Sequence, residues 1–195
     1  MKQDIRQRRT AAGPFVIFFL ALILIFSGFM HGFAQSSSIT DSARGLISLG
    51  SYERAVAILE QGTERYKDSV SFHRLLGQAY LGMRKFDKAI DEFLHAAYID
   101  DCDSCSVDYD RVGEIFLEGK AFKSAIKYFE KALMKGSKTA KVKIGLASLN
   151  EGGEDIKRHD YNSAINALKV GIETPEDTLL YERLLYCYFM NGDDY

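Results

Sequence analysis

Four alanines at near-regular spacing constrain the fold of this chain more than any other feature. Each alanine follows an aromatic residue by three positions, and a large apolar residue and then a small residue come four and seven positions after it. Offsets of three, four and three lie on one stripe of an α-helix. The four copies are Tyr52–Ala55–Leu59–Gly62, Phe86–Ala89–Phe93–Ala96, Phe122–Ala125–Phe129–Ala132 and Tyr161–Ala164–Leu168–Gly171. A pattern that returns every 34 to 40 residues predicts stacked copies of one small unit.

A further helix precedes the alanine stripe in each unit. It is marked by an apolar residue, a glycine and, three positions later, an aromatic residue. We assign to this pattern Leu76-Gly77-x-x-Tyr80, Val112-Gly113-x-x-Phe116, Ile144-Gly145 with Ser148, and the terminal Tyr181-x-x-Leu184-Leu185-x-x-Tyr188. Glycines at Gly50, Gly82 and Gly119 mark short turns between the two helices. The sequence therefore predicts an all-α solenoid of antiparallel helix–turn–helix units.

This pattern resembles the tetratricopeptide repeat family over residues 36–195, with His73, Tyr109 and Tyr181 at the place of the family's tryptophan. The resemblance implies a right-handed superhelix with units at 36–69, 70–103, 106–137 and 138–176 and a terminal helix at 177–190. It also implies a non-enzymatic adaptor whose concave groove binds a peptide or protein segment. Family roles in assembling secretion, pilus or outer-membrane machinery follow from the resemblance, and nothing in the sequence selects among them.

Apolar residues directly after the conserved aromatic predict a ladder along the concave groove. This groove ladder consists of Ile47, Leu81, Leu117, Leu149 and Phe189. An extended or helical peptide could lay apolar side chains against it. The alternative is that these residues complete the packing between adjacent first helices. Polar groove positions of mixed charge lie beside the ladder, at Arg74, Gln78, Asp110 and Glu114.

The first 34 residues read as a leader outside the fold. Four basic residues precede an apolar run over 15–30, and Gly32-Phe33-Ala34 fits a signal-peptidase site. Cleavage after Ala34 is one interpretation. The other is an uncleaved membrane anchor at residues 11–30, a stretch of 20 residues without a charge. Both interpretations place the repeats outside the cytoplasm, in the periplasm or another extracytoplasmic space.

The charge balance argues against nucleic acid as a partner. Removing residues 1–34 takes away four basic residues and one acidic residue, so the formal net charge moves from −2 to −5. A mildly acidic array without a basic stripe does not fit a phosphate backbone. The expected partner is therefore a protein or peptide.

Cys102 and Cys105 lie in the predicted loop between the second and third units. A disulfide that pins the loop, a pair of free thiols and a redox pair are all open, and the last gives an alternative function as a thiol-redox or envelope-complex assembly factor. A haem site is excluded because Ser106 stands where histidine is needed. One cysteine pair with a distant Cys187 is too few ligands for zinc.

No other motif predicts chemistry. The histidines are scattered, there is no glycine-rich phosphate loop, and we expect no catalytic residue, cofactor or metal. The acidic run at 151–155 is expected to be a solvated connector in a long loop that reaches residue 160. The terminal helix is apolar on nearly every side, which predicts either a missing continuation or docking against a partner or another copy.

Overall fold

The computed structural model describes residues 18, 22, 36–100, 105–172 and 178–192. Within those ranges the chain consists of helices and turns, without strands. A helix over residues 36–48 comes first, and the helices that follow are α2 (Tyr52–Arg65), α3 (Val70–Gly82), α4 (Phe86–Ile99), α5 (Cys105–Glu118), α6 (Phe122–Met134), α7 (Ala140–Lys157), α8 (Tyr161–Ile172) and α9 (Thr178–Asn191). The predicted all-α solenoid is confirmed.

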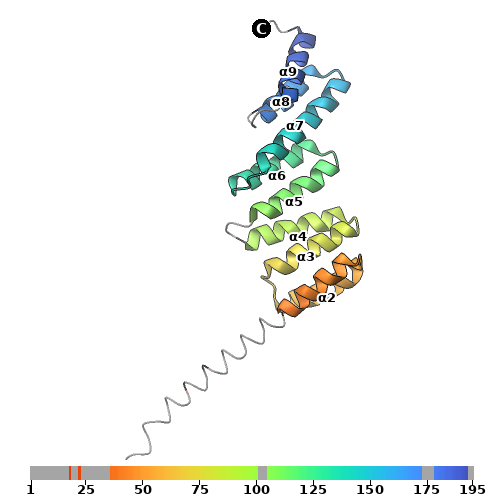
Figure 1. The fold of residues 1–195 in the computed structure, drawn as a ribbon, viewed down its shortest axis with the longest axis vertical. Helices are drawn as coiled ribbons and strands as arrows, with labels where there is room; N and C mark the ends of the chain where they lie inside the picture. Colours follow the sequence, from red (N-terminus) through yellow and green to blue (C-terminus); the bar gives the residue numbers. More distant parts are fainter. Residues whose placement is uncertain (1–17, 19–21, 23–35, 101–104, 173–177, 193–195) are drawn as a thin grey trace, which may run out of the picture.

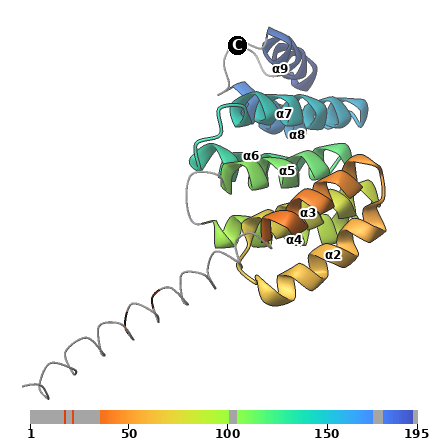
Figure 2. The ribbon, with the colours of Figure 1, turned by 60° about the horizontal axis from the view of Figure 1, so that its bottom comes forward.

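The helices stack along one long axis, each against its neighbours in sequence (Figure 1). The pairs α3–α4, α5–α6 and α7–α8 each form one unit, and α4–α5, α6–α7 and α8–α9 join successive units. Figure 2 shows the same order from another side, with α9 at the opposite end of the stack from α2. Each unit contacts little beyond its neighbours, which is the quasi-one-dimensional packing of a solenoid.

The alanine stripe explains why the second helices pack so closely. Ala55, Ala89, Ala125 and Ala164 are fully buried. The large residues four positions later, Leu59, Phe93, Phe129 and Leu168, are buried at 0 to 1% exposure. Small side chains let the helix axes approach, and the large residues fill the space beside them. The hydrophobic core therefore runs the length of the stack.

Glycines on the first helices receive these large side chains. A Cβ atom at Gly77 would lie 2.9 Å from the Phe93 ring, and one at Gly113 would lie 2.5 Å from the Phe129 ring. The fourth unit has the same contact at Gly152, where a Cβ would lie 2.7 Å from Cγ of Leu168. In each case the glycine precedes its partner by 16 residues. Only a hydrogen atom fits at these places.

A left-handed backbone residue ends every first helix at the same distance from this position. It comes seven residues after Gly77, Gly113 and Gly152, at Arg84 (φ 57°), Lys120 (φ 58°) and His159 (φ 59°). The same conformation occurs at Gly50 and Gly192. By this register, Ala43 and Leu185 are the counterparts of the three glycines. Equivalent bonds close the turns, with Lys85 N–H donating to Tyr80 C=O (2.9 Å) and Asp160 N–H to Asp155 C=O (3.0 Å).

This register corrects two expectations for the fourth unit. Gly152, and not Gly145, is the counterpart of Gly77, so the assigned Ile144-Gly145 pair lies seven residues too early. The run from Glu151 to Asp155 is also not a solvated loop, because it belongs to α7 and buries both Glu151 and Asp155. The long first helix α7 absorbs the extra residues of this unit.

The predicted leader, residues 1–34, lies outside the described residues except for Phe18 and Leu22, which are exposed. None of the helices in the described part of the chain is long and apolar enough to cross a membrane.

Candidate functional site

The first helices of successive units present one continuous face. On each of them, four positions with offsets of three, four and three lie on a single stripe. We call these positions the groove stripe, and they are Ser71, Arg74, Gln78 and Leu81 on α3; Val107, Asp110, Glu114 and Leu117 on α5; Leu146, Leu149, Gly153 and Ile156 on α7; and Leu179, Glu182, Tyr186 and Phe189 on α9. The stripe changes from polar on α3 and α5 to largely apolar on α7 and α9.

The polar residues of the stripe join adjacent first helices. Arg74 on α3 donates to both carboxylate oxygens of Asp108 on α5, at 2.8 and 2.7 Å, and to Asp100 at 2.8 Å. Asp108 is almost completely buried. Burial raises the pKa of its carboxyl, and the hydrogen bonds from Arg74 oppose that rise. Arg74, predicted as a groove contact, is therefore committed to an internal ion pair.

The next interface repeats this arrangement with a lysine. Lys143 on α7 donates to Glu114 at 2.8 Å and forms an ion pair with Asp110 at 3.3 Å. The Ser137 hydroxyl also donates to the buried Asp110, at 2.7 Å. Of the four predicted polar groove residues, the structure thus leaves Gln78 as the exposed one, while Arg74, Asp110 and Glu114 hold units together.

The apolar part of the stripe is open to solvent at equivalent positions. Val107, Leu146 and Leu179, each six residues before the glycine position, are 53%, 47% and 41% exposed. Val142, one turn before Leu146, is also exposed. Apolar side chains repeated at one position of successive first helices form a row across α5, α7 and α9. The sequence analysis missed this row because its register for the fourth unit was wrong.

The predicted groove ladder is packed more deeply than this row. Ile47, Leu81 and Leu117 are half-buried against the core, while Phe189 is exposed. Leu149 is also half-buried, but the register places Ile156, and not Leu149, in line with Leu81 and Leu117. Leu149 is instead the counterpart of Arg74 and Asp110.

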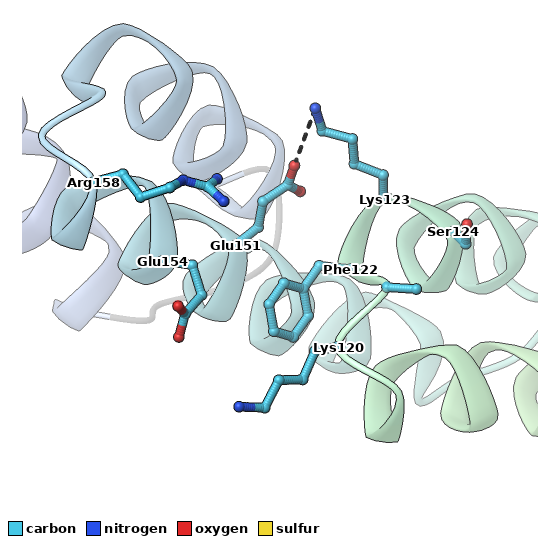
Figure 3. Close-up of a pocket in the computed structure, with 8 residues that line it drawn as sticks. Lys120, Phe122, Lys123, Ser124, Glu151, Glu154 and Arg158 are labelled. Atoms are coloured by element: carbon cyan, nitrogen blue, oxygen red, sulfur yellow. Dashed lines mark ion pairs between the residues drawn. The ribbon is translucent and has the colours of Figure 1, made fainter.

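A charged hollow of about 420 Å³ lies at the start of α6, beside the second half of α7 (Figure 3). Its lining includes Lys120, Phe122, Lys123, Glu154 and Arg158. Glu151 reaches from α7 toward Lys123, with the two charged groups 3.6 Å apart. A hollow of about 390 Å³ occupies the equivalent place one unit earlier, lined by Ile115 and Phe116 among others. The fourth unit thus carries charge where the third is apolar.

Buried carboxylates set this fourth-unit hollow apart. Glu151 and Asp155 are buried, and their counterparts in the third unit are Val112 and Phe116. Burial raises the pKa of Glu151, while Lys123 opposes that rise. Arg158 forms an ion pair with Asp155. Both cations are mostly exposed, so each buried acid is compensated from the surface.

The cysteines give no support to a reactive thiol. Cys105 is the first residue of α5 and is fully buried, and burial raises the pKa of its thiol. A redox cysteine needs the opposite shift. Cys102 lies outside the described residues, so its pairing with Cys105 stays a prediction. Cys187 is buried, and its thiol pKa is likewise raised by burial. Within the described ranges, no three His, Cys, Asp or Glu side chains gather in a way that could hold a metal ion.

Comparison with known proteins agrees with this geometry. Residues 40–104 match the family model of the tetratricopeptide repeat. The chain is similar in fold to MamA from Desulfovibrio magneticus RS-1 (16% identity, TM-score 0.51, covering 81% of this chain and 86% of that chain). It is also similar to the TPR2AB domain of yeast Sti1 in complex with pHSP90 (14%, 0.52, 81% and 71%). A third similar structure is YrrB, a TPR protein with an unusual peptide-binding site (15%, 0.53, 80% and 77%). Among curated protein sequences, none matches this chain.

Proposed function

We propose that this array of tetratricopeptide-type units is a non-enzymatic scaffold that binds a protein segment along its groove stripe. The observation that carries the proposal is the exposed row of Val107, Leu146 and Leu179. A soluble surface that repeats an apolar side chain at one register position is suited to a partner with periodic apolar residues. Similar folds that bind peptides, such as YrrB, support the same kind of partner.

The polar half of the stripe gives the partner a defined place on the groove. The ion pairs of Arg74 and Lys143 neutralise most of its charge internally, so they offer a ligand little electrostatic attraction. Apolar contact with α5, α7 and α9 therefore supplies the affinity. We infer that the bound segment lies over the C-terminal half of the array and carries apolar side chains.

Selection from a random-peptide display library against the full chain tests this proposal. We expect selected peptides to be rich in apolar residues and to lose binding when Leu146 is changed to glutamate. Leu146 is suitable because it is half-exposed, so the substitution leaves the core intact. Leu81 and Leu117 are poor test sites, since a charge at these half-buried positions would also lower the free energy of unfolding.

Tyr98→Glu on α4 is the matched control, because Tyr98 is 83% exposed on a second helix. Peptides that bind the Leu146→Glu and Tyr98→Glu variants equally well would contradict a groove site. Replacing both Cys102 and Cys105 with serine separates the scaffold from the thiol-redox alternative. The scaffold proposal expects unchanged peptide binding in that variant.

We also propose that residues 1–34 direct the array out of the cytoplasm, either as a cleaved signal or as an anchor at residues 11–30. The basic start, the apolar run and Gly32-Phe33-Ala34 support this proposal. A fusion of residues 1–60 to alkaline phosphatase, expressed in a bacterium, tests it because the enzyme becomes active only after export. Phosphatase activity is expected, and its loss is expected when charged residues interrupt the apolar run. An inactive, full-length fusion would contradict export.

A further inference from the structure

The most exposed apolar side chains of α9 lie on one stripe outside the groove row. Tyr181, Leu185 and Phe189 are 53%, 56% and 76% exposed. They are spaced four residues apart, so they form one ridge along the helix. We call these three residues the α9 ridge.

The centre of this ridge corresponds to a helix-packing position in every other unit that the structure describes in full. Leu185 is seven residues before Gly192, as Gly77, Gly113 and Gly152 are before their left-handed residues. Those glycines are covered by Phe93, Phe129 and Leu168 of the second helix in their own unit. The α9 ridge thus continues a face that is a helix–helix interface three times over in the array.

The ridge is also symmetric about Leu185. Tyr181 lies four residues before it and Phe189 four residues after it. When two such helices pair in an antiparallel manner about a two-fold axis at Leu185, the two leucines meet at the centre. Each Tyr181 then meets Phe189 of the other copy. Interlocking of ridges spaced by four residues is the commonest way for helices to pack, and aromatic pairs add to it.

From this symmetry we propose that the α9 ridge binds a second copy of the same chain, in a two-fold symmetric dimer through α9. The position of α9 at one end of the stack leaves a second copy room to approach along the long axis (Figures 1 and 2). The contact closes on itself, because an isologous interface uses the same surface on both copies.

The exposed area sets the strength of this dimer. The three side chains together expose roughly 400 Å², given the usual size of such residues. Two copies would bury about 800 Å² from the ridge, below the ~1,200 Å² of a standard stable interface. A weak dimer is therefore expected, with a dissociation constant of micromolar order or higher. The groove row of Val107 and Leu146 stays open in such a dimer.

Sedimentation velocity of the full chain over a range of concentrations tests the dimer. The wild type should show a monomer–dimer equilibrium. Leu185→Glu should raise the dissociation constant about tenfold or more, since two charges would face each other at the axis, while Tyr98→Glu should leave it unchanged. A wild type that remains monomeric at high concentration would overturn the proposal, as would a Leu185→Glu variant that associates like the wild type.

A cross-link checks the symmetry itself. In Leu185→Cys, the two new thiols lie near the axis and should form an intermolecular disulfide under mild oxidation, beyond any cross-linking of the wild type. Absence of the additional cross-linked dimer would overturn the two-fold arrangement. Peptide binding by the Leu185→Glu variant reports on the groove separately, so the failure of one proposal can be told from the failure of the other.

Discussion

Gly152 lies against Leu168 so closely that a Cβ atom there would be 2.7 Å from the leucine Cγ. The same relationship joins Gly77 to Phe93 and Gly113 to Phe129, always with 16 residues between the partners. This contact fixes the register of the fourth unit and shows why α7 continues to Lys157. The units are therefore equivalent in packing even where their sequences differ.

Gly152→Ala should lower the free energy of unfolding by about 1–3 kcal/mol, because the added methyl group overpacks the α7–α8 contact. Gly45→Ala is the matched control. Gly45 is also helical, but a Cβ there meets nothing within 4 Å, so its better helix propensity should raise stability by up to about 1 kcal/mol. Urea unfolding measures both variants. Equal effects of the two substitutions would contradict the register.

The alanine stripe was sufficient to predict the second helices, because its residues repeat with one spacing. The first helix of the fourth unit was harder. Ile144-Gly145 offers an apolar–glycine pair, whereas the residues that stand in the equivalent place are Glu151 and Gly152, and a buried glutamate breaks the apolar pattern. The 16-residue distance from Gly152 to Leu168 was the signal that could have corrected it.

The candidate site shows a similar division. Helical spacing predicted which residues face the groove, but it could not show that Arg74 is committed to Asp108. That contact joins different units and depends on how the helices stack. Exposure of Val107 and Leu146 likewise follows from packing between units, so it was visible only in the structure.

Arg74→Met should cost about 3–5 kcal/mol of unfolding free energy, because it leaves the buried Asp108 carboxylate without its cation. Part of that loss should return as the pH is lowered, since protonation neutralises Asp108. Arg44→Met removes an exposed ion pair with Asp41 and should change stability by less than about 0.5 kcal/mol. Chemical denaturation of both variants at several pH values checks this. A similar small effect of the two substitutions would show that the Arg74–Asp108 pair does not hold α3 to α5.

Glu151→Gln should raise stability at neutral pH by about 1 kcal/mol, because it removes a buried charge and leaves only the highly exposed Lys123 without its carboxylate. The pKa of Glu151 is raised by burial in the folded state, so the wild type binds more protons folded than unfolded. Its stability therefore falls as the pH rises from the unfolded-state value of 4.5 through the folded-state pKa.

The difference between Glu151→Gln and the wild type should consequently be small near pH 4.5 and grow toward neutral pH. Thermal or urea unfolding across this range measures it. The exposed Glu118, changed to glutamine, is the control and should show no such growth. A constant difference across the pH range would contradict the burial of an ionised Glu151.

Arg84→Gly should raise the free energy of unfolding by about 1 kcal/mol, because Arg84 holds a left-handed backbone (φ 57°) that costs a side chain more than glycine. Its neighbour Lys85 has φ −91°, so Lys85→Gly should be neutral or destabilising. Equilibrium unfolding of the two variants distinguishes them. Destabilisation by Arg84→Gly would show that the turn between α3 and α4 does not have this conformation.

The central claim is that the exposed row on α5, α7 and α9 binds a protein segment. Its most direct test is the affinity of one display-selected peptide, measured by fluorescence anisotropy, for the wild type and for the Leu146→Glu and Tyr98→Glu variants. The account predicts a loss of about tenfold or more for Leu146→Glu, or at least 1.4 kcal/mol of binding free energy, and an unchanged affinity for Tyr98→Glu. An affinity that is the same for the wild type and Leu146→Glu would contradict it.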